Sequence, residues 1–482
     1  MATLRERIAN LVERAAENNS WRQHRCFNLI PSETTPSLLV KMCEISDPAG
    51  RYAEHRTMKG KEIYFYQGID FIREVEEEAR AELCTYFGCS EVELRPISGQ
   101  MANEVVFKAV TKLINRENAP GQPFRRMRSV MNNDLTKGGH LSSQPMGALF
   151  NYVEIDPETG KEAVVNFPIR EDNPYRTDET KLEDLLRTHR PELVVFGKSM
   201  FIYREPVRFV ARIAAELDPP PILMYDMAHV LGLYGLFQEP LAEGADIVTG
   251  STHKTFFGPQ RGVVASNMEK GTPLRKLWIE TKSRAFPGST SNHHLGTLLA
   301  LLLATYEMNA FKEEYQSQVR KNAKAWAKAL VAYGVEVEGD PSDGYTETHQ
   351  VLLRVRKYGI GEDIARRLEE NNIVANYQAL PDDPSFINSS GIRTGVQEMT
   401  RFGMQERDFD RLAGFTAEVV INNKDVADEV AAYRKEFNEM QYCLPPEEAA
   451  QFGARLLATV LPNSDYSKLF ADNLIAAAAL AR

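Results

Sequence analysis

Two stretches that lie close together in the chain decide the fold: PILMYDMAH at 221–229 and ADIVTGSTHK at 245–254. Each contains a short apolar run that is followed by a charged residue, Asp226 after the first run and Lys254 after the second. Short apolar runs bounded by turn signals are typical of buried strands. Because ligands of parallel sheets sit at the carboxyl ends of the strands, we expect Asp226 and Lys254 to face the same crevice.

The same alternation of elements extends outward from these two runs. Further apolar runs occur at 128–133 (RSVMNN) and 192–197 (ELVVFG), with helical stretches at 181–189 (KLEDLLRTH) and 204–217 (REPVRFVARIAAEL). Strands and helices that alternate in this way predict an α/β layer with a largely parallel sheet. Earlier in the chain, apolar residues at three- and four-residue steps predict a helix that begins near Asp70 and ends at Gly88 as its C-cap.

Changes in sequence pattern divide the chain into four predicted parts. The first 24 residues have the spacing of an amphipathic helix, and from about Ala300 a long helical stretch leads into strand-like VEVEG and HQVLLRVRKYG. The last segment reads as helical and closes with IAAAALAR. We predict an N-terminal helical arm (1–30), a large domain (31–299), a smaller α+β domain (300–423) and a helical extension (424–482).

Composition excludes several classes of function. The net charge of −10 argues against nucleic-acid binding, since a phosphate backbone is held mainly by Lys and Arg. The five cysteines have no spacing typical of metal ligands, so we expect no metal site and a reducing compartment. The N-terminus lacks the apolar core of a signal peptide, and the apolar stretch Leu295–Thr305 is too short to span a bilayer. We therefore expect a cytoplasmic protein without a nucleic-acid or membrane partner.

Asp226 and Lys254 suggest a particular chemistry. A lysine that can lose its proton forms an imine with the aldehyde of pyridoxal 5'-phosphate (PLP), and a carboxylate beside it keeps the pyridine nitrogen protonated. Alone, the pair is a weak signal, because Asp and Lys at strand ends are usually solvated loop residues.

A series of segments strengthens the signal, because they resemble the serine hydroxymethyltransferase family in the same order along the chain. They are LIPSET (29–34), RYAEHR (51–56), FYQG (65–68), PISGQMAN (96–103), DLTKGGHLS (134–142), YDMAHVLGL (225–233), STHKTFFGP (251–259), AFPGS (285–289) and SGIRTG (390–395). The resemblance implies a PLP-dependent enzyme of fold type I. Such a fold has a large domain with a mostly parallel seven-stranded sheet and a smaller α+β domain.

The resemblance assigns the cofactor site residue by residue. Lys254 matches the imine lysine, and Asp226 matches the partner of the pyridine nitrogen. His229 matches the residue near the phenolic oxygen of the cofactor, and His140 the histidine that stacks on its ring. The remaining expected cofactor contacts are Ser98, Gly99, Gln100, Ser199, Thr252 and His253.

Substrate binding is assigned in the same way. Arg393 resembles the arginine that grips the substrate α-carboxylate, which a guanidinium fork can bind in a bidentate manner. Ser32 resembles a helper at that carboxylate, although helix capping is an alternative role for it.

Four residues match positions that family members lend across a dimer interface. Tyr52 and Gly288 would reach the cofactor phosphate of the other subunit, while Glu54 and Tyr66 would handle protons at the substrate hydroxyl. The resemblance therefore implies a homodimer or a dimer of dimers with shared active sites, in which Tyr52, Glu54 and Tyr66 also contact the substrate.

The chain departs from the family pattern mainly on the side where the second substrate is expected, although Leu135, Gly138, Gly139 and Leu141 still match folate contacts. The departures are Phe65, Gln100, Lys137, Gln260 followed by Arg261, Gln378, the loop HRTMKGKEIYF (55–65) and the stretch SNHHLG (291–296).

Three functions remain open at the level of sequence. The first is aldol chemistry on β-hydroxy-α-amino acids through a glycyl quinonoid, as in serine–glycine interconversion with tetrahydrofolate as co-substrate. The second is a folate-independent threonine aldolase or transaldolase that passes the glycyl carbanion to another aldehyde. The third is a specialised decarboxylation or oxidation at Cα.

Overall fold

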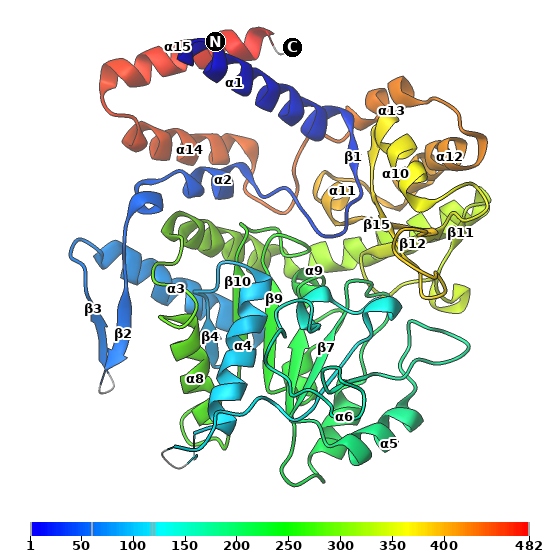
Figure 1. The fold of residues 1–482 in the computed structure, drawn as a ribbon. Helices are drawn as coiled ribbons and strands as arrows, with labels where there is room; N and C mark the ends of the chain where they lie inside the picture. The colour runs from blue at the N-terminus through cyan, green and yellow to red at the C-terminus, as the bar shows by residue number, and fades with distance from the viewer. Residues whose placement is uncertain (1, 59–60, 117, 119–120, 481–482) are drawn as a thin grey trace.

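A seven-stranded sheet forms the centre of the protein, whose computed structural model describes residues 2–58, 61–116, 118 and 121–480 (Figure 1). The strand order is β4-β10-β9-β8-β7-β5-β6, and the five strands from β9 to β6 are parallel, with β10 antiparallel to both of its neighbours. This arrangement confirms the predicted α/β fold. The strands are β4 (Glu91–Glu93), β5 (Val130–Asn132), β6 (Val164–Asn166), β7 (Leu193–Gly197), β8 (Ile222–Asp226), β9 (Ile247–Ser251) and β10 (Gly262–Ser266).

Both faces of this sheet are buried. Along β7, Val194 and Phe196 belong to one buried cluster, whereas Leu193 and Val195 belong to a second cluster on the opposite face. This alternation follows from the two-residue period of a strand. Continuous apolar runs are therefore needed here, and they are the pattern from which the strands were predicted.

Helices cover the two faces, and the longest of them, α9, packs against α2, α3 and α12. Helix α3 begins at Asp70 as predicted, and Gly88 caps it with a φ of 60°. The helices of this part are α2 (Leu38–Glu44), α3 (Asp70–Phe87), α4 (Gly99–Ile114), α5 (Glu179–His189), α6 (Val207–Ala214), α7 (Pro240–Glu243), α8 (Arg275–Ala285) and α9 (Leu295–Ala332).

A smaller antiparallel sheet, in the order β11-β12-β15-β14, lies beside the large one (Figure 1). Its strands are β11 (Glu336–Val337), β12 (Gln350–Arg354), β14 (Asn376–Gln378) and β15 (Gly391–Gly395). Around it lie α10 (Gly361–Glu370), α11 (Gln397–Arg401), α12 (Glu406–Asn422) and the parallel pair β1 (Phe27–Asn28) and β13 (Ile373–Val374). The predicted division into four parts stays a prediction, and α9 runs unbroken across the expected boundary at residue 300.

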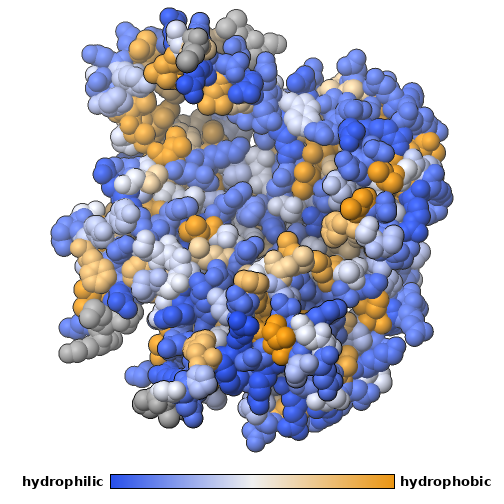
Figure 2. All heavy atoms as spheres, in the orientation of Figure 1, coloured by the Kyte–Doolittle hydropathy of each residue, from blue (hydrophilic) through white to orange (hydrophobic). Residues whose placement is uncertain are grey.

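Helices from both ends of the described chain lie above the main body in the view of Figure 1. The elements there are α1 (Leu4–Ser20), α14 (Pro446–Val460) and α15 (Ser464–Leu480), and α13 (Ala427–Arg434) precedes α14. No residue of α1 is buried, and apolar side chains gather on this part of the surface (Figure 2). In the described part of the chain, no helix combines the length and apolar character needed to cross a membrane.

The segment between Glu54 and Tyr66 was expected to be a loop, and this expectation is wrong. Strands β2 (His55–Met58) and β3 (Lys61–Tyr64) form an antiparallel hairpin, in which His55 pairs with Tyr64. Residues 59–60 of the expected loop lie outside the described residues. The segment has no clear two-residue alternation of apolar and polar residues, which is why its sequence did not predict strands.

The close approach of β10 to the start of α4 gives a stability prediction. A Cβ atom at Gly262 would lie 2.1 Å from the carbonyl oxygen of Ser98, a backbone atom that cannot move aside without shifting α4. We expect Gly262→Ala to lower the free energy of unfolding by roughly 1–3 kcal/mol, measured as a lower melting temperature. Gly50→Ala is the control, because nothing lies within 4 Å of its added Cβ. Equal melting temperatures for the two variants would contradict the prediction.

Candidate active site

A pocket of about 580 Å³ opens beside the carboxyl ends of β8 and β9, where Asp226 and Lys254 were expected to meet. It brings together residues of the large sheet, the small sheet and the loops between them. Its lining residues are Ser32, Leu135, His140, Leu141, Met146, Ser199, His229, His253, Lys254, Gln378, Phe386 and Arg393.

Asp226 does not line this pocket itself, but as a buried, hydrogen-bonded carboxylate it contacts His140, which does. Its Oδ2 accepts a hydrogen bond of 2.7 Å from Asn103 Nδ2 and lies 2.5 Å from His140 Nδ1, while its Oδ1 accepts from the backbone N–H of Ala228 at 2.9 Å. Burial raises the pKa of the Asp226 carboxyl, but His140 and these hydrogen bonds outweigh burial and hold the pKa below its ordinary value. Asp226 is therefore ionised at neutral pH.

Lys254 follows β9 and lies with its Nζ 3.2 Å from His229 Nε2. Burial lowers the pKa of Lys254 to about 8, against the opposing effect of Asp226. Burial, together with the charges of Lys254 and Arg393, also keeps the pKa of His229 well below its usual value. A neutral histidine thus faces an amine that loses its proton far more readily than an ordinary lysine, whose pKa is about 10.4.

Arg393 enters the pocket from β15 as a buried cation. Its NH1 donates to the carbonyl of Ser199 at 2.9 Å, and its Nε donates to Oδ1 of Asn376, its cross-strand partner, at 3.3 Å. Among the described residues no carboxylate forms an ion pair with it, and burial alone lowers its pKa to about 10. A buried guanidinium without a counter-ion is costly, so this arrangement suits an anionic ligand.

The N-terminus of α4 borders the end of β9. Ser98 caps the helix by accepting a hydrogen bond from the backbone N–H of Met101 at 3.1 Å. A Cβ atom at Gly99 would lie 2.0 Å from Ser251 Oγ, so a side chain at this position would displace the Ser251 hydroxyl. Gln100, in the first turn, is exposed. Unpaired backbone N–H groups at a helix start suit a phosphate.

The remaining expected residues divide into two groups. Thr252 is fully buried. Its hydroxyl donates to Pro259 O at 2.6 Å and accepts from the N–H of Arg261 at 3.1 Å, so it shapes the loop that follows β9 and carries Lys254, which we call the lysine loop. The residues expected to act across an interface do not line the pocket of their own chain: Tyr52, Glu54, Tyr66 and Gly288. Tyr52 and Tyr66 are exposed and their rings lie 5.4 Å apart.

Three residues of the site were missed by the sequence reasoning. Asn103 holds Asp226 from α4, Asn376 holds Arg393, and the buried His349 lies behind the pocket with its Nε2 3.0 Å from Pro31 O. Burial keeps the pKa of His349 at about 3, so it is neutral. For Asn103, a signal was present, since a polar residue on the apolar face of a helix usually has a buried partner.

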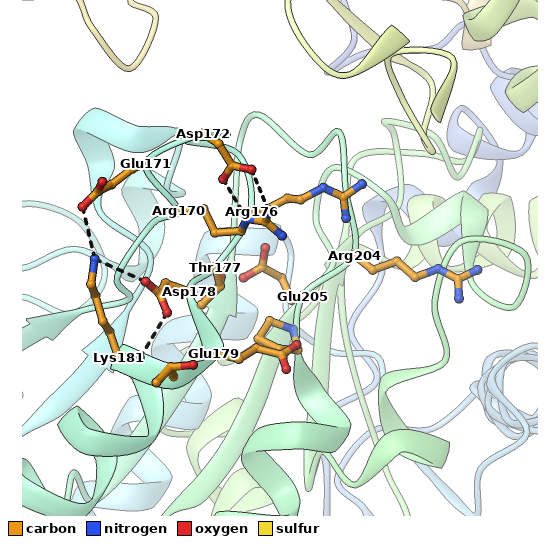
Figure 3. A pocket seen from close by; sticks show the side chains of 12 residues that line it. Arg170, Glu171, Asp172, Arg176, Thr177, Asp178, Glu179, Lys181, Arg204 and Glu205 are labelled. Carbon is orange, nitrogen blue, oxygen red and sulfur yellow. Dashed lines mark hydrogen bonds and ion pairs between the residues drawn. The ribbon is translucent and has the colours of Figure 1, made fainter. Parts of the chain in front are cut away.

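A second pocket, of about 740 Å³, is lined by charged side chains and includes none of the expected site residues (Figure 3). Its charges pair with one another, since Arg170 binds Asp172 at 2.6 Å and Lys181 lies 3.3 Å from Asp178. Within the described ranges, no group of three or more His, Cys, Asp or Glu side chains is placed to hold a metal ion.

The first pocket fits PLP. Lys254 offers an amine for its aldehyde, Asp226 an ionised carboxylate for its ring nitrogen, and the start of α4 backbone donors for its phosphate. In addition, the Nδ1 atoms of His229 and His253 are buried without a hydrogen-bond partner. Fold and site together define an α/β enzyme of the PLP-dependent class.

Comparison with known proteins identifies the family. A family model described as serine hydroxymethyltransferase matches residues 5–416. A serine hydroxymethyltransferase of Staphylothermus marinus is 38% identical over 90% of this chain and 93% of its own. Those of Archaeoglobus fulgidus and Sulfolobus acidocaldarius are 38% and 34% identical over 88% and 96% of this chain, and over 90% and 100% of their own lengths.

The chain therefore belongs to the serine hydroxymethyltransferase family, as the sequence motifs predicted, and is a PLP-dependent enzyme. The structure is also similar to a crystal structure of L-threonine transaldolase from Pseudomonas fluorescens, with a TM-score of 0.76 and 27% identity over 94% of this chain and 98% of that one. The two leading functions predicted from the sequence are thus both represented among its relatives.

The lowered pKa of Lys254 gives a pH prediction. The neutral amine is the nucleophile, so attachment of added PLP to the apoprotein should speed up with pH and level off above about 8. An ordinary lysine would keep gaining rate toward pH ~10.4. The measurement is the rate at which the visible absorbance of lysine-bound PLP appears, and Lys254→Ala is the control that forms no such band. A half-maximal rate near pH 10 would contradict the prediction.

Proposed function

We propose that this protein interconverts serine and glycine by transferring a hydroxymethyl group, with PLP attached to Lys254 and tetrahydrofolate as the one-carbon acceptor. One observation carries the proposal. Arg393 is buried without a counter-ion in the same pocket as Lys254, an amine with a pKa of about 8. An amino acid matches these two groups, because its carboxylate pairs with the guanidinium while its amine reaches the lysine position.

The cofactor is held by residues of the large sheet. PLP, when bound, supplies an electron-accepting ring for bonds at the amino-acid Cα. Asp226 keeps a negative charge at the ring nitrogen, and His140, hydrogen-bonded to Asp226, limits where the ring can lie. Ser98, Gly99 and Gln100 present the start of α4 to the phosphate.

Substrate orientation comes from the small sheet. Arg393 fixes the carboxylate, Asn376 and Ser199 O hold the guanidinium in place, and Ser32 lies at the edge of the same pocket. A fixed carboxylate leaves the other Cα bonds in defined orientations, which is how positioning contributes to rate. Neutral His229 accepts or donates a proton at Lys254 Nζ, 3.2 Å away.

Proton transfer at the substrate hydroxyl is assigned to Glu54 and Tyr66 of a second copy, with Tyr52 and Gly288 of that copy at the phosphate. We infer a homodimer, because these residues lie outside the pocket of their own chain. We propose a cytoplasmic location, as the sequence predicts. The accessible surface supports an assembly. It amounts to 23027 Å² for this 54.4 kDa chain, against roughly 18,000 Å² expected for a compact monomer of that mass.

A folate-independent transaldolase is the second candidate, and the mouth of the pocket is compatible with its acceptor. Leu141, Met146 and Phe386 line this mouth with 50%, 73% and 52% of their surfaces exposed. Such an apolar rim fits a flat ring, which either a pterin or an aromatic aldehyde supplies. The transaldolase likeness described above points to the same alternative.

Folate dependence decides between the two functions. We expect formation of glycine from serine to require tetrahydrofolate, with little threonine cleavage in its absence. The measurement is product formation from each amino acid with and without tetrahydrofolate. Rapid acetaldehyde release from threonine without folate, increased by an added aromatic aldehyde, would instead establish the transaldolase reading.

Arg393 gives a separate prediction that holds for both functions. Arg393→Ala should raise the KM for the amino acid at least tenfold, because the carboxylate loses a charge-assisted bidentate partner. The PLP absorbance should stay unchanged, since Arg393 does not contact the lysine. Arg407→Ala is the matched control, as that guanidinium is exposed on α12. An unchanged KM in Arg393→Ala would remove the carboxylate assignment.

A further inference from the structure

A buried cluster of charges lies where three departures from the family pattern meet. Its centre is Glu76 on α3, a carboxylate with no exposed surface. Around it lie His55 from the hairpin sequence HRTMKGKEIYF, His293 from SNHHLG, Arg261 from GPQRG, and Arg80. We call these five residues the Glu76 cluster. The pocket and the proposed chemistry use none of them.

The contacts of Glu76 join separate parts of the chain. Its Oε1 lies 2.9 Å from Arg80 and 3.3 Å from His55 Nε2, and its Oε2 lies 3.5 Å from His293 Nε2. Burial raises the pKa of Glu76, but its contacts with the two histidines outweigh burial and hold the pKa well below its usual value. Glu76 is therefore an anion that ties β2 to α3 and to the segment before α9.

From His293 the contacts continue to the lysine loop. Arg261 NH2 lies 3.0 Å from His293 Nδ1, which must accept because a guanidinium only donates. Arg261 and Thr252 are joined by hydrogen bonds in both directions. The backbone N–H of Thr252 donates to the carbonyl of Arg261 at 3.0 Å, and the backbone N–H of Arg261 donates to Thr252 Oγ1 at 3.1 Å. Thr252 stands two residues before Lys254. A continuous series of contacts thus runs from the hairpin to the proposed cofactor lysine.

His55 closes this series in its protonated form. Its Nδ1 lies 3.2 Å from the carbonyl of Ala53 and its Nε2 faces two carboxylates, Glu76 at 3.3 Å and Glu62 at 3.9 Å. Because both ring nitrogens face acceptors, the doubly protonated ring satisfies both. The ring also stacks on Tyr64, with centroids 4.5 Å apart. Burial lowers the pKa of His55, but Glu76 outweighs burial and raises it above its ordinary value.

His55 lies next to Glu54, so its anchorage decides where Glu54 lies. We propose that the Glu76 cluster is the joint that fixes Glu54 and Tyr66 on the body of their own subunit, from which they reach the pocket of the second copy, with protonated His55 as its closing contact. His55 and Glu76 are positioning residues, because they contact neither PLP nor substrate. The inference rests on the proposed function, since it assigns the position of residues that act there.

The sign of the pH dependence follows from the groups around His55. These are Glu62 and Tyr64 on β3, Glu76 and Arg80 on α3, Arg95 after β4, and His293 before α9. A raised pKa means that the contact is complete below the unperturbed value near 6.5 and is lost as the pH rises through the raised value. Turnover should therefore decline on the alkaline side as His55 loses its proton.

The test compares three variants with the wild-type holoenzyme across pH. In His55→Gln, we expect kcat to fall roughly 10- to 100-fold, with the pH dependence due to His55 lost, because Glu54 is no longer held in place. The KM for serine and the PLP absorbance should not change, since Arg393 and Lys254 are untouched. In Glu76→Gln, the alkaline decline should move to lower pH, because an amide no longer stabilises the proton on His55.

The matched control is His294→Gln, which changes the exposed histidine next to His293 and should behave as wild type. Wild-type kcat and pH profile in both His55→Gln and Glu76→Gln would overturn the inference. Loss of the PLP band in both variants would overturn it as well, by showing that the cluster serves the cofactor site. If the wild-type protein itself lacks turnover of serine and threonine, the proposed function fails, an outcome that is separate from these.

Discussion

The buried charge of Asp226 is the constraint on which the site depends. A carboxylate with 1% of its surface exposed has lost its hydration, and that loss must be offset by donors placed around it. The donors come from three elements: Asn103 on α4, His140 in the glycine-rich turn, and the backbone of Ala228. Each donor fixes its own element at the end of the sheet. A single anion therefore sets the positions of the start of α4, of His140 and of the crevice between β8 and β9.

The positive side of the site is balanced differently. Arg393 is buried and Lys254 is half-buried, and desolvation lowers the pKa of each, so the protein itself offers them incomplete compensation. Anionic groups of a ligand supply the missing part, and binding that compensates a buried charge also stabilises the folded state. The same reasoning separates this pocket from the second one. There, the pairs Arg170–Asp172 and Lys181–Asp178 already satisfy one another at the surface.

Local patterns could predict much of this structure. The strands that end at Asp226 and before Lys254 are short apolar runs, and the helix from Asp70 to its cap at Gly88 follows from periodicity and one left-handed residue. Contacts between distant positions could not be predicted in this way. Asn103 and Asp226 are 123 residues apart, and nothing in the sequence near either one names the other.

The hairpin and the Glu76 cluster show the same limit. The hairpin could not be predicted because its strands are short and rich in charged residues, without the regular alternation of apolar and polar residues that indicates a strand. The family resemblance marked the hairpin, SNHHLG and Arg261 as separate departures. These departures lie together in the fold, because His55 and His293 both contact Glu76. The roles of the site residues remain predictions for the same reason, since a motif names a residue type and a fold supplies its neighbours.

Helix α9 has a mechanical consequence. With 38 residues it is about 57 Å long, at a rise of 1.5 Å per residue, and it runs unbroken from the end of SNHHLG to the small sheet. Large domain rotations need hinges in loops or at the ends of elements, and an uninterrupted, buried helix is a beam that resists them. The stiffness of α9 therefore helps to fix the distance between the strand that carries Arg393 and the loop that carries Lys254. Leu141, Met146 and Phe386 line the mouth of the pocket, apart from this helix. Under the proposed function, selectivity for the acceptor can therefore change at the mouth while Lys254 and Arg393 keep their positions.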